Sequence, residues 1–223
     1  MEKQSRTLKL LEWITHHSIN GFPPLSSAEK LASRYIKNEK FADNDRRVKS
    51  LIKWEASKNF TTGFLTGLGG LITIPLSVPG SLAAAWLIQA RMVGAIAIIY
   101  GHDIREDSVK TLLILCLQGD DIKKILKNAG VKITNRTLTQ ILIRTPSSVL
   151  IEINKKVGYR LVAKTGEKSI ASMSKIIPVA GSVISGGIDA YACRKIGYIA
   201  KDIFSMQAID KDKNEIQVKT DRI

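Results

Sequence analysis

Apolar residues recur at helical spacing along nearly the whole chain. Residues 3–18 place Leu8, Leu11 and Ile14 on one face of a helix, and the glycine and prolines of NGFPPLSS, residues 20–27, then interrupt the pattern. The same period returns in the segments that follow, and no segment requires a strand. The pattern therefore predicts an all-α fold.

Capping residues and glycines mark where these helices begin and end. Ser26 and Glu29 have capping-box spacing at the start of a second helix, and Asp103 and Glu106 have the same spacing further on. The other expected boundaries are Asp43 or Asn44 at a helix start, Gly101 and Gly130 at helix ends, and Thr145 followed by Pro146 at a later helix start.

One stretch of 32 residues, from Asn59 to Ala90, contains no charged residue and exceeds the roughly 20 residues that a transmembrane helix needs. Five glycines and two prolines interrupt it, and a straight helix through a bilayer would carry those prolines at its centre. We therefore predict a hairpin of two helices, about 43–73 and 81–101, at the centre of a soluble domain. A re-entrant hairpin inserted in a membrane is the alternative.

The C-terminal part of the chain repeats this apolar unit at an offset of 103 residues. Ile74-Pro75 corresponds to Ile177-Pro178, and Arg91 corresponds to Arg194. We infer a single compact helical domain with two glycine-rich apolar helical hairpins that pack as a pseudo-symmetric pair. The hairpin motif consists of Gly63, Gly67, Gly69, Gly70, Pro75, Gly186, Gly187 and Gly197.

Asp189 lies in the second apolar unit and needs a partner, because a lone buried charge is costly. Arg91, in the corresponding stretch of the first unit, is the candidate. We therefore predict a structural ion pair between Arg91 and Asp189.

The composition of the 223 residues adds a strong positive charge to this picture. With 34 Lys and Arg against 20 Asp and Glu, the formal net charge is +14, which favours contact with an anionic surface.

Cys116 and Cys193 lie in apolar helical contexts and should be buried. The N-terminus lacks a signal-peptide pattern, so we expect a cytoplasmic protein. Along the chain we expect an N-terminal helical extension over 1–40, a helical domain over 41–206 and a charged tail over 207–223.

The basic residues of the helices form three stripes. No helix-turn-helix pattern or array of stacking aromatic residues accompanies them, so nucleic acid is the less favoured partner. Because the stripes flank apolar hairpins, they favour an anionic membrane surface or lipid, with an acidic protein partner as the alternative. The stripes are Arg46, Arg47, Lys49 and Lys53; Lys123, Lys124 and Lys127; and Lys155, Lys156 and Arg160.

The sequence offers little catalytic chemistry. GFLTGLGG, residues 63–70, follows no strand and lacks the Lys-Ser/Thr ending of a P-loop. We predict no catalytic site, no metal and no cofactor. One enzymatic alternative remains, a hydrolase-type site in a polar pocket formed by Tyr100, His102, Asp103 and Arg91.

Three motifs resemble the EcsC protein family, over roughly residues 40–205. They are the glycine-rich helix with Thr62-Gly63, Gly69-Gly70 and Pro75, then QARMVGAIAIIYGHD at 89–103, and GGIDAYACRKIGYIAKDIF at 186–204. The chain departs from many relatives near Ser81, where they carry an acidic residue. The resemblance implies a bacterial origin and a link with membrane-associated processes, and it brings no established activity.

These observations predict a non-enzymatic protein of the bacterial cytoplasm that acts at the inner face of the membrane. Basic helices would attract it to anionic lipid, and the apolar hairpins would bind or insert. The alternatives are the hydrolase-type enzyme and an adaptor or immunity-type protein that binds an acidic partner. The sequence makes no prediction of oligomeric state.

Overall fold

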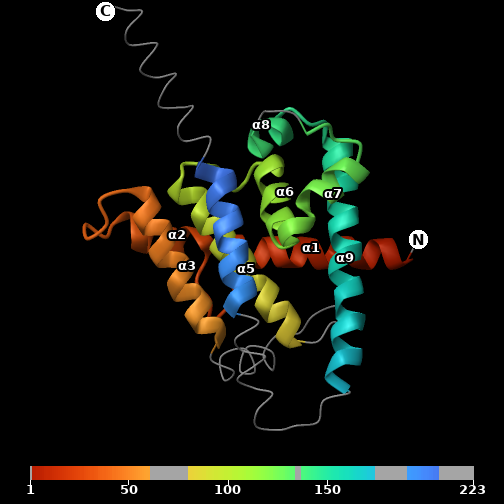
Figure 1. Cartoon of the computed structure of the whole chain (residues 1–223), viewed down its shortest axis with the longest axis horizontal. Coiled ribbons are helices and arrows are strands. Elements are labelled where there is room, and N and C mark those ends of the chain that lie inside the picture. Colours follow the sequence, from red (N-terminus) through yellow and green to blue (C-terminus); the bar gives the residue numbers. More distant parts are fainter. Residues whose placement is uncertain (1, 61–79, 134–136, 174–189, 206–223) are drawn as a thin grey trace, which may run out of the picture.

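The structure is a computed structural model that describes residues 2–60, 80–133, 137–173 and 190–205. Helices make up the regular structure of these residues (Figure 1), and their one β-type pairing is an isolated bridge between Phe22 and Leu25. The all-α prediction is confirmed. The helices are α1 (Glu2–Asn20), α2 (Ala28–Ile36), α3 (Asn44–Phe60), α5 (Gly80–Ile99), α6 (Asp107–Cys116), the short 3-10 helix η1 (Gly119–Asp121), α7 (Ile122–Asn128), α8 (Leu138–Ile143) and α9 (Ser147–Met173), and residues 190–205 form a further helix, called the C-terminal helix below.

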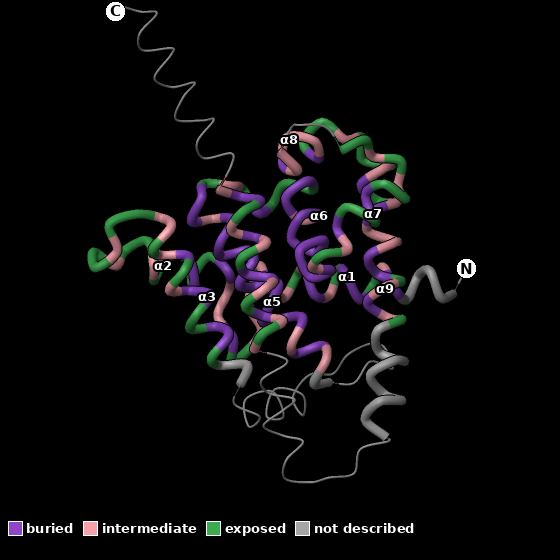
Figure 2. The backbone as a smooth tube through the Cα atoms, in the orientation of Figure 1, coloured by how far each residue is buried: buried purple, intermediate pink, exposed green. Residues whose placement is uncertain are grey.

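α5 is the central helix of the core. It packs against α1, α2, α3 and α6, and buried residues follow it along most of its length (Figure 2). Since neighbours cover it on several sides, its sequence is apolar nearly all round rather than on one stripe. Within the described ranges, Leu82–Ile99 of α5 is the one stretch long and apolar enough to cross a membrane, and 89% of it is buried inside the protein. Its apolar character is therefore explained by its place in the core.

α1 and α2 contribute to the same core as α5. α1 contacts α5, α6 and α9, and α2 contacts α3 and α5. Leu10 and Ile14 of α1, Leu31 of α2 and Met92 of α5 belong to one buried hydrophobic cluster. The division of the chain near residue 40 stays a prediction, and in space these helices share one core with the rest.

Several expected helix boundaries are confirmed. Gly101 follows α5 with a φ of 82°, and Gly130 follows α7 with a φ of 78°. Both lie in the left-handed region that glycine adopts without strain. Asp43 accepts a hydrogen bond at 2.7 Å from the backbone N–H of Arg46 at the start of α3.

The start of α2 lies one residue later than the capping-box spacing indicates. Ser27, not Ser26, caps the helix, and its hydroxyl accepts a hydrogen bond at 3.1 Å from the N–H of Lys30. The two adjacent serines carry the same capping group, so sequence spacing alone does not separate them.

Two later starts also differ from expectation. The Asp103 carboxylate accepts at 2.8 Å from the N–H of Arg105 in a turn, and α6 begins only at Asp107. The Thr145 hydroxyl donates at 2.8 Å to the carbonyl of Ile141 in the preceding helix instead of capping α9. In both cases the short polar side chain satisfies a nearby backbone group outside the helix start.

The C-terminal helix packs against α3 and α5. At Gly197, a Cβ would lie only 2.7 Å from Cγ1 of Ile52, and the Cys193 thiol lies 4.0 Å from the sulfur of Met92. The described parts of the two apolar units are therefore in contact. The hairpin turns and the motif residues other than Gly197 lie outside the described residues, and α6 separates α9 from the C-terminal helix in the view of Figure 1. The hairpins and their pseudo-symmetry stay predictions.

Gly197→Ala should destabilise the protein by about 1–3 kcal/mol, because the added methyl overpacks the contact with Ile52. We expect a lower midpoint in urea unfolding with an unchanged slope. On the background of Ile52→Ala, which removes the opposing atoms, the same substitution should cost clearly less. If Gly197→Ala lowered the free energy of unfolding equally with Ile52 present and with Ile52→Ala, the two helices would not be in contact at this glycine.

Candidate functional site

Arg91 forms an ion pair in the core between α5 and α3. Its guanidinium lies 2.6 Å from the carboxylate of Glu55, and both residues are buried. The guanidinium also donates to the carbonyl of Ser26 at 3.3 Å, before α2. Asp189, the expected partner, lies outside the described residues. Glu55 is therefore the partner of Arg91 that the structure describes. In the sequence, Glu55 lies on the apolar stripe of α3, beside Ile52 and Ala56, and this position indicates a buried carboxylate that needs a cationic partner.

Tyr35 of α2 lies in the field of this pair. Burial, and then the Glu55 carboxylate, raise the pKa of Tyr35 to about 12. The phenol therefore stays protonated across the physiological range and has the character of a structural group.

Tyr100 and Asp45 belong to a second polar cluster, where α5 ends. The Tyr100 hydroxyl donates to Asp45 at 3.4 Å, and Asp45 also pairs at 2.7 Å with Lys49 of α3 and with Lys201 of the C-terminal helix. Burial, and then Asp45, raise the pKa of Tyr100 far above its usual range. The cluster joins α3, α5 and the C-terminal helix.

His102 joins the end of α5 to the C-terminal helix. Its Nε2 lies 3.0 Å from the carbonyl oxygen of Phe204, which fits an Nε2–H donor, and its ring packs against the Phe204 ring. Asp103 is engaged with its own turn. Arg91 precedes Tyr100 by nine residues of α5, roughly 13 Å along the helix axis. The structure therefore does not bring Arg91, Tyr100, His102 and Asp103 together around one described pocket.

Cys116 and Cys193 are buried, as expected. Burial raises the pKa of the Cys116 thiol to about 12. The thiol stays protonated in the core and behaves as a small apolar side chain.

The three basic stripes do not form one surface. Those of α7 and α9 lie near each other, where Arg160 pairs with Asp121 at 2.7 Å, while α3 lies on the opposite side of the molecule (Figure 1). Neighbouring carboxylates also neutralise part of the α3 stripe and part of the α9 stripe. Arg46 pairs with Asp43, Lys49 with Asp45 and Lys156 with Glu152, whereas Lys123, Lys124 and Lys127 of α7 are exposed and have no carboxylate partner among the described residues.

Four helix termini lie toward the same end of the molecule (Figure 1). α3 ends there, α5 begins, α9 ends and the C-terminal helix begins, and we call this region the junction end. Trp54 near the end of α3 is 59% exposed, and Tyr191 at the start of the C-terminal helix is 70% exposed. Lys53 and Arg194 are exposed beside them in sequence. α7, with its lysines, lies toward the opposite end.

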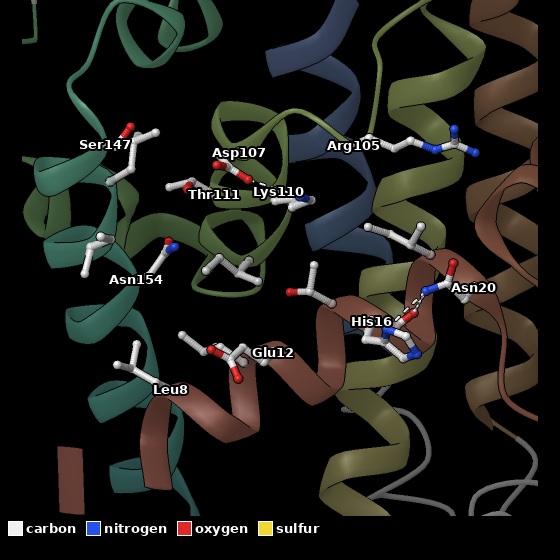
Figure 3. A pocket seen from close by; sticks show the side chains of 16 residues that line it. Leu8, Glu12, His16, Asn20, Arg105, Asp107, Lys110, Thr111, Ser147 and Asn154 are labelled. Atoms are coloured by element: carbon white, nitrogen blue, oxygen red, sulfur yellow. Dashed lines mark hydrogen bonds and ion pairs between the residues drawn. The ribbon is translucent and has the colours of Figure 1, made fainter. Parts of the chain in front are cut away.

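A groove of about 820 Å³ lies between α1, the start of α6 and the start of α9 (Figure 3). Apolar side chains from all three helices line it, with charged side chains along its edges. Sequence reasoning did not find it, because its three walls come from distant parts of the chain. The apolar lining is Leu8, Leu11, Ile19, Ile114, Leu150 and Ile151, and the polar lining includes Glu12, His16, Arg105, Asp107, Lys110, Thr111 and Asn154.

Comparison with known proteins gives one match. The family model described as the EcsC protein family matches residues 5–209. The match begins within α1, and so it includes the two N-terminal helices as well as the motifs from residue 62 onward. Comparisons with curated proteins and with solved structures gave no match.

The Asp45 cluster should make stability depend on acid pH. Hydrogen bonds from Lys201 and Lys49 lower the pKa of Asp45 from its ordinary 3.8 to about 2. Because the folded pKa lies below the unfolded one, the stabilisation is complete above pH 3.8 and is lost as the pH falls toward 2. The melting temperature should therefore fall less steeply between those values for Asp45→Asn than for the unaltered protein.

This difference should shrink in high salt, since Asp45 and Lys49 are partly exposed and their attraction is screened. Parallel melting curves for the two proteins over this pH range would contradict the assignment.

Proposed function

This chain belongs to the EcsC protein family, and we propose that it acts at the anionic cytoplasmic face of a membrane, which it meets with its junction end. The observation that carries the proposal is the shared position of four helix termini. The segment 61–79, which has no charged residue, and the segment 174–189, which has only Lys175 and Asp189, both join the described helices there. The described helix ends that border both glycine-rich apolar sequences therefore lie toward one end of the domain.

The side chains around the junction end support contact with lipid headgroups. Trp54 and Tyr191 are the most exposed large apolar side chains of the described residues. Tryptophan and tyrosine are enriched where a protein meets the boundary between headgroups and acyl chains. Lys53 and Arg194 add positive charge beside them, which anionic headgroups attract. Arg194 also lies 5.9 Å from the centre of the Tyr198 ring.

The proposed contact is with the membrane surface and leaves the helical core intact. α5, the one described helix of sufficient length and apolarity to span, is enclosed by α1, α2, α3 and α6. Extracting it would expose Arg91 to lipid and separate it from the buried Glu55 carboxylate of α3, and both changes would be unfavourable.

The other two functions suggested by the sequence have less support. A hydrolase-type site would need Tyr100, His102, Asp103 and Arg91 to converge, whereas each has a structural interaction of its own. An adaptor for an acidic protein would use the α7 end, where the sequence has six basic and no acidic residues between Asp121 and Glu152. That end is remote from the junction end, so the two surfaces can be tested separately.

Vesicle flotation tests the proposal. The unaltered protein should float with vesicles of phosphatidylcholine and phosphatidylglycerol at low salt, and should stay in solution with phosphatidylcholine alone or at molar salt. Trp54→Ser combined with Tyr191→Ser should weaken binding by at least about tenfold, because two exposed aromatic anchors are lost. Because each of the two residues is more than half exposed, the variant should remain folded, which a cooperative melting transition would show.

Charge reversal at the two ends of the molecule provides a matched control. Lys53→Glu with Arg194→Glu alters the junction end, and Lys123→Glu with Lys127→Glu makes the same change of charge at α7. Only the first pair should abolish flotation. Equal losses would indicate attraction by net charge without a defined contact, and an unaltered protein that stays in solution with anionic vesicles would refute membrane binding.

A further inference from the structure

We propose that the groove between α1, α6 and α9 binds a small neutral amphipathic molecule, with an apolar body and a hydroxyl or amide group. This site is separate from the junction end and does not depend on membrane binding. The groove volume of about 820 Å³ lies within the ≈300–1,000 Å³ usual for small-molecule sites.

The apolar lining of the groove remains partly open to solvent. Ile151 of α9 is 50% exposed, and Leu8 and Ile19 of α1 are only half-buried. Leu11, Ile114 and Leu150 continue this lining into the core. Covering it with an apolar ligand would remove hydrocarbon surface from water, which is favourable.

Two polar atoms at the groove call for a hydrogen-bonding ligand. The hydroxyl oxygen of Thr111 and the amide oxygen of Asn154 are buried and have no hydrogen-bond partner within the described part of the chain. Thr111 is only 1% exposed and lines the groove from α6, while Asn154 lines it from α9 (Figure 3). A buried polar atom without a partner is costly, and a ligand hydroxyl could accept from Thr111 or donate to Asn154.

The charges at the edges of the groove favour a neutral ligand. Lys110 pairs with Asp107 at 3.0 Å, and Arg105 pairs with Glu29 at 3.2 Å. On the opposite wall, Glu12 of α1 adds a carboxylate. The two cations and two carboxylates of the lining balance, although the whole chain has a net charge of +14. Glu12 is exposed, so solvent screens its charge. An ionised headgroup placed at the buried atoms of Thr111 and Asn154 would therefore lose hydration without a buried opposite charge to replace it.

Titration calorimetry with three probes of equal chain length tests the ligand class. The probes are monododecanoylglycerol, dodecanoic acid and dodecylamine, each below its aggregation concentration and without vesicles. We expect monododecanoylglycerol to bind at least about tenfold more tightly than either ionised probe, since only it satisfies the buried polar atoms without a stranded charge. Equal binding of the three probes, or no binding of monododecanoylglycerol, would overturn the proposal.

Two variants locate the binding site. Ile151→Trp should fill the groove and abolish binding, while Ile143→Trp, at an isoleucine of α8 that is 49% exposed and lies outside the groove lining, should bind as the unaltered protein does. Thr111→Val should raise the dissociation constant about fivefold and leave the melting temperature of the free protein unchanged or higher, because it removes an unpartnered hydroxyl. Unchanged affinity in both Ile151→Trp and Thr111→Val would overturn the assignment.

Discussion

The guanidinium of Arg91 and the carboxylate of Glu55 lie 2.6 Å apart, almost without access to solvent. Each charge alone would be strongly unfavourable in this core, so each requires the other, and loss of one partner of such a pair typically costs about 3–5 kcal/mol. The pair joins α3 to α5, and the bond from Arg91 to the Ser26 carbonyl adds the segment before α2. It therefore fixes the relative position of two helices whose adjoining ends, Phe60 and Gly80, border the uncharged residues 61–79.

The C-terminal helix completes this arrangement. Its Gly197 packs against Ile52 of α3, and its Lys201 pairs with Asp45. The carbonyl of Phe204 forms a hydrogen bond with His102. These contacts lie along its length, so the helix runs beside α3 with its first turn at the junction end. The result is a domain with two different ends. One carries exposed aromatic residues and the borders of both apolar segments, and the other carries the lysines of α7. The groove at α1, α6 and α9 is a third feature, lined mainly by apolar groups and balanced in charge.

Local patterns in the sequence predicted much of the fold, because helical period and glycine conformation are local properties. The core positions Leu11, Ile14 and Cys116, and the helix ends at Gly101 and Gly130, follow from them. Long-range pairing was not predictable in the same way. Glu55 stands on an apolar stripe, but nothing local selects Arg91, 36 residues later, as its partner. The spacing of Lys and Arg residues identified the basic stripes but did not show which carboxylates pair with them. It also did not show that α3 and α7 lie on opposite sides of the molecule. The exposure of Trp54 and Tyr191 was also not predictable, because large apolar side chains are expected to be buried. Only the packing of the helices shows that these two are exposed.

The orientation at the membrane can be measured directly with a fluorophore that responds to polarity. Because Cys116 and Cys193 are buried, a single new cysteine can be labelled selectively at Ser57, on α3 near the junction end, or at Asn128, on α7. Addition of anionic vesicles should shift the emission of the label at Ser57 to shorter wavelength and leave that of the label at Asn128 unchanged. A shift at Asn128 alone, or at neither position while the protein is bound, would contradict contact through the junction end.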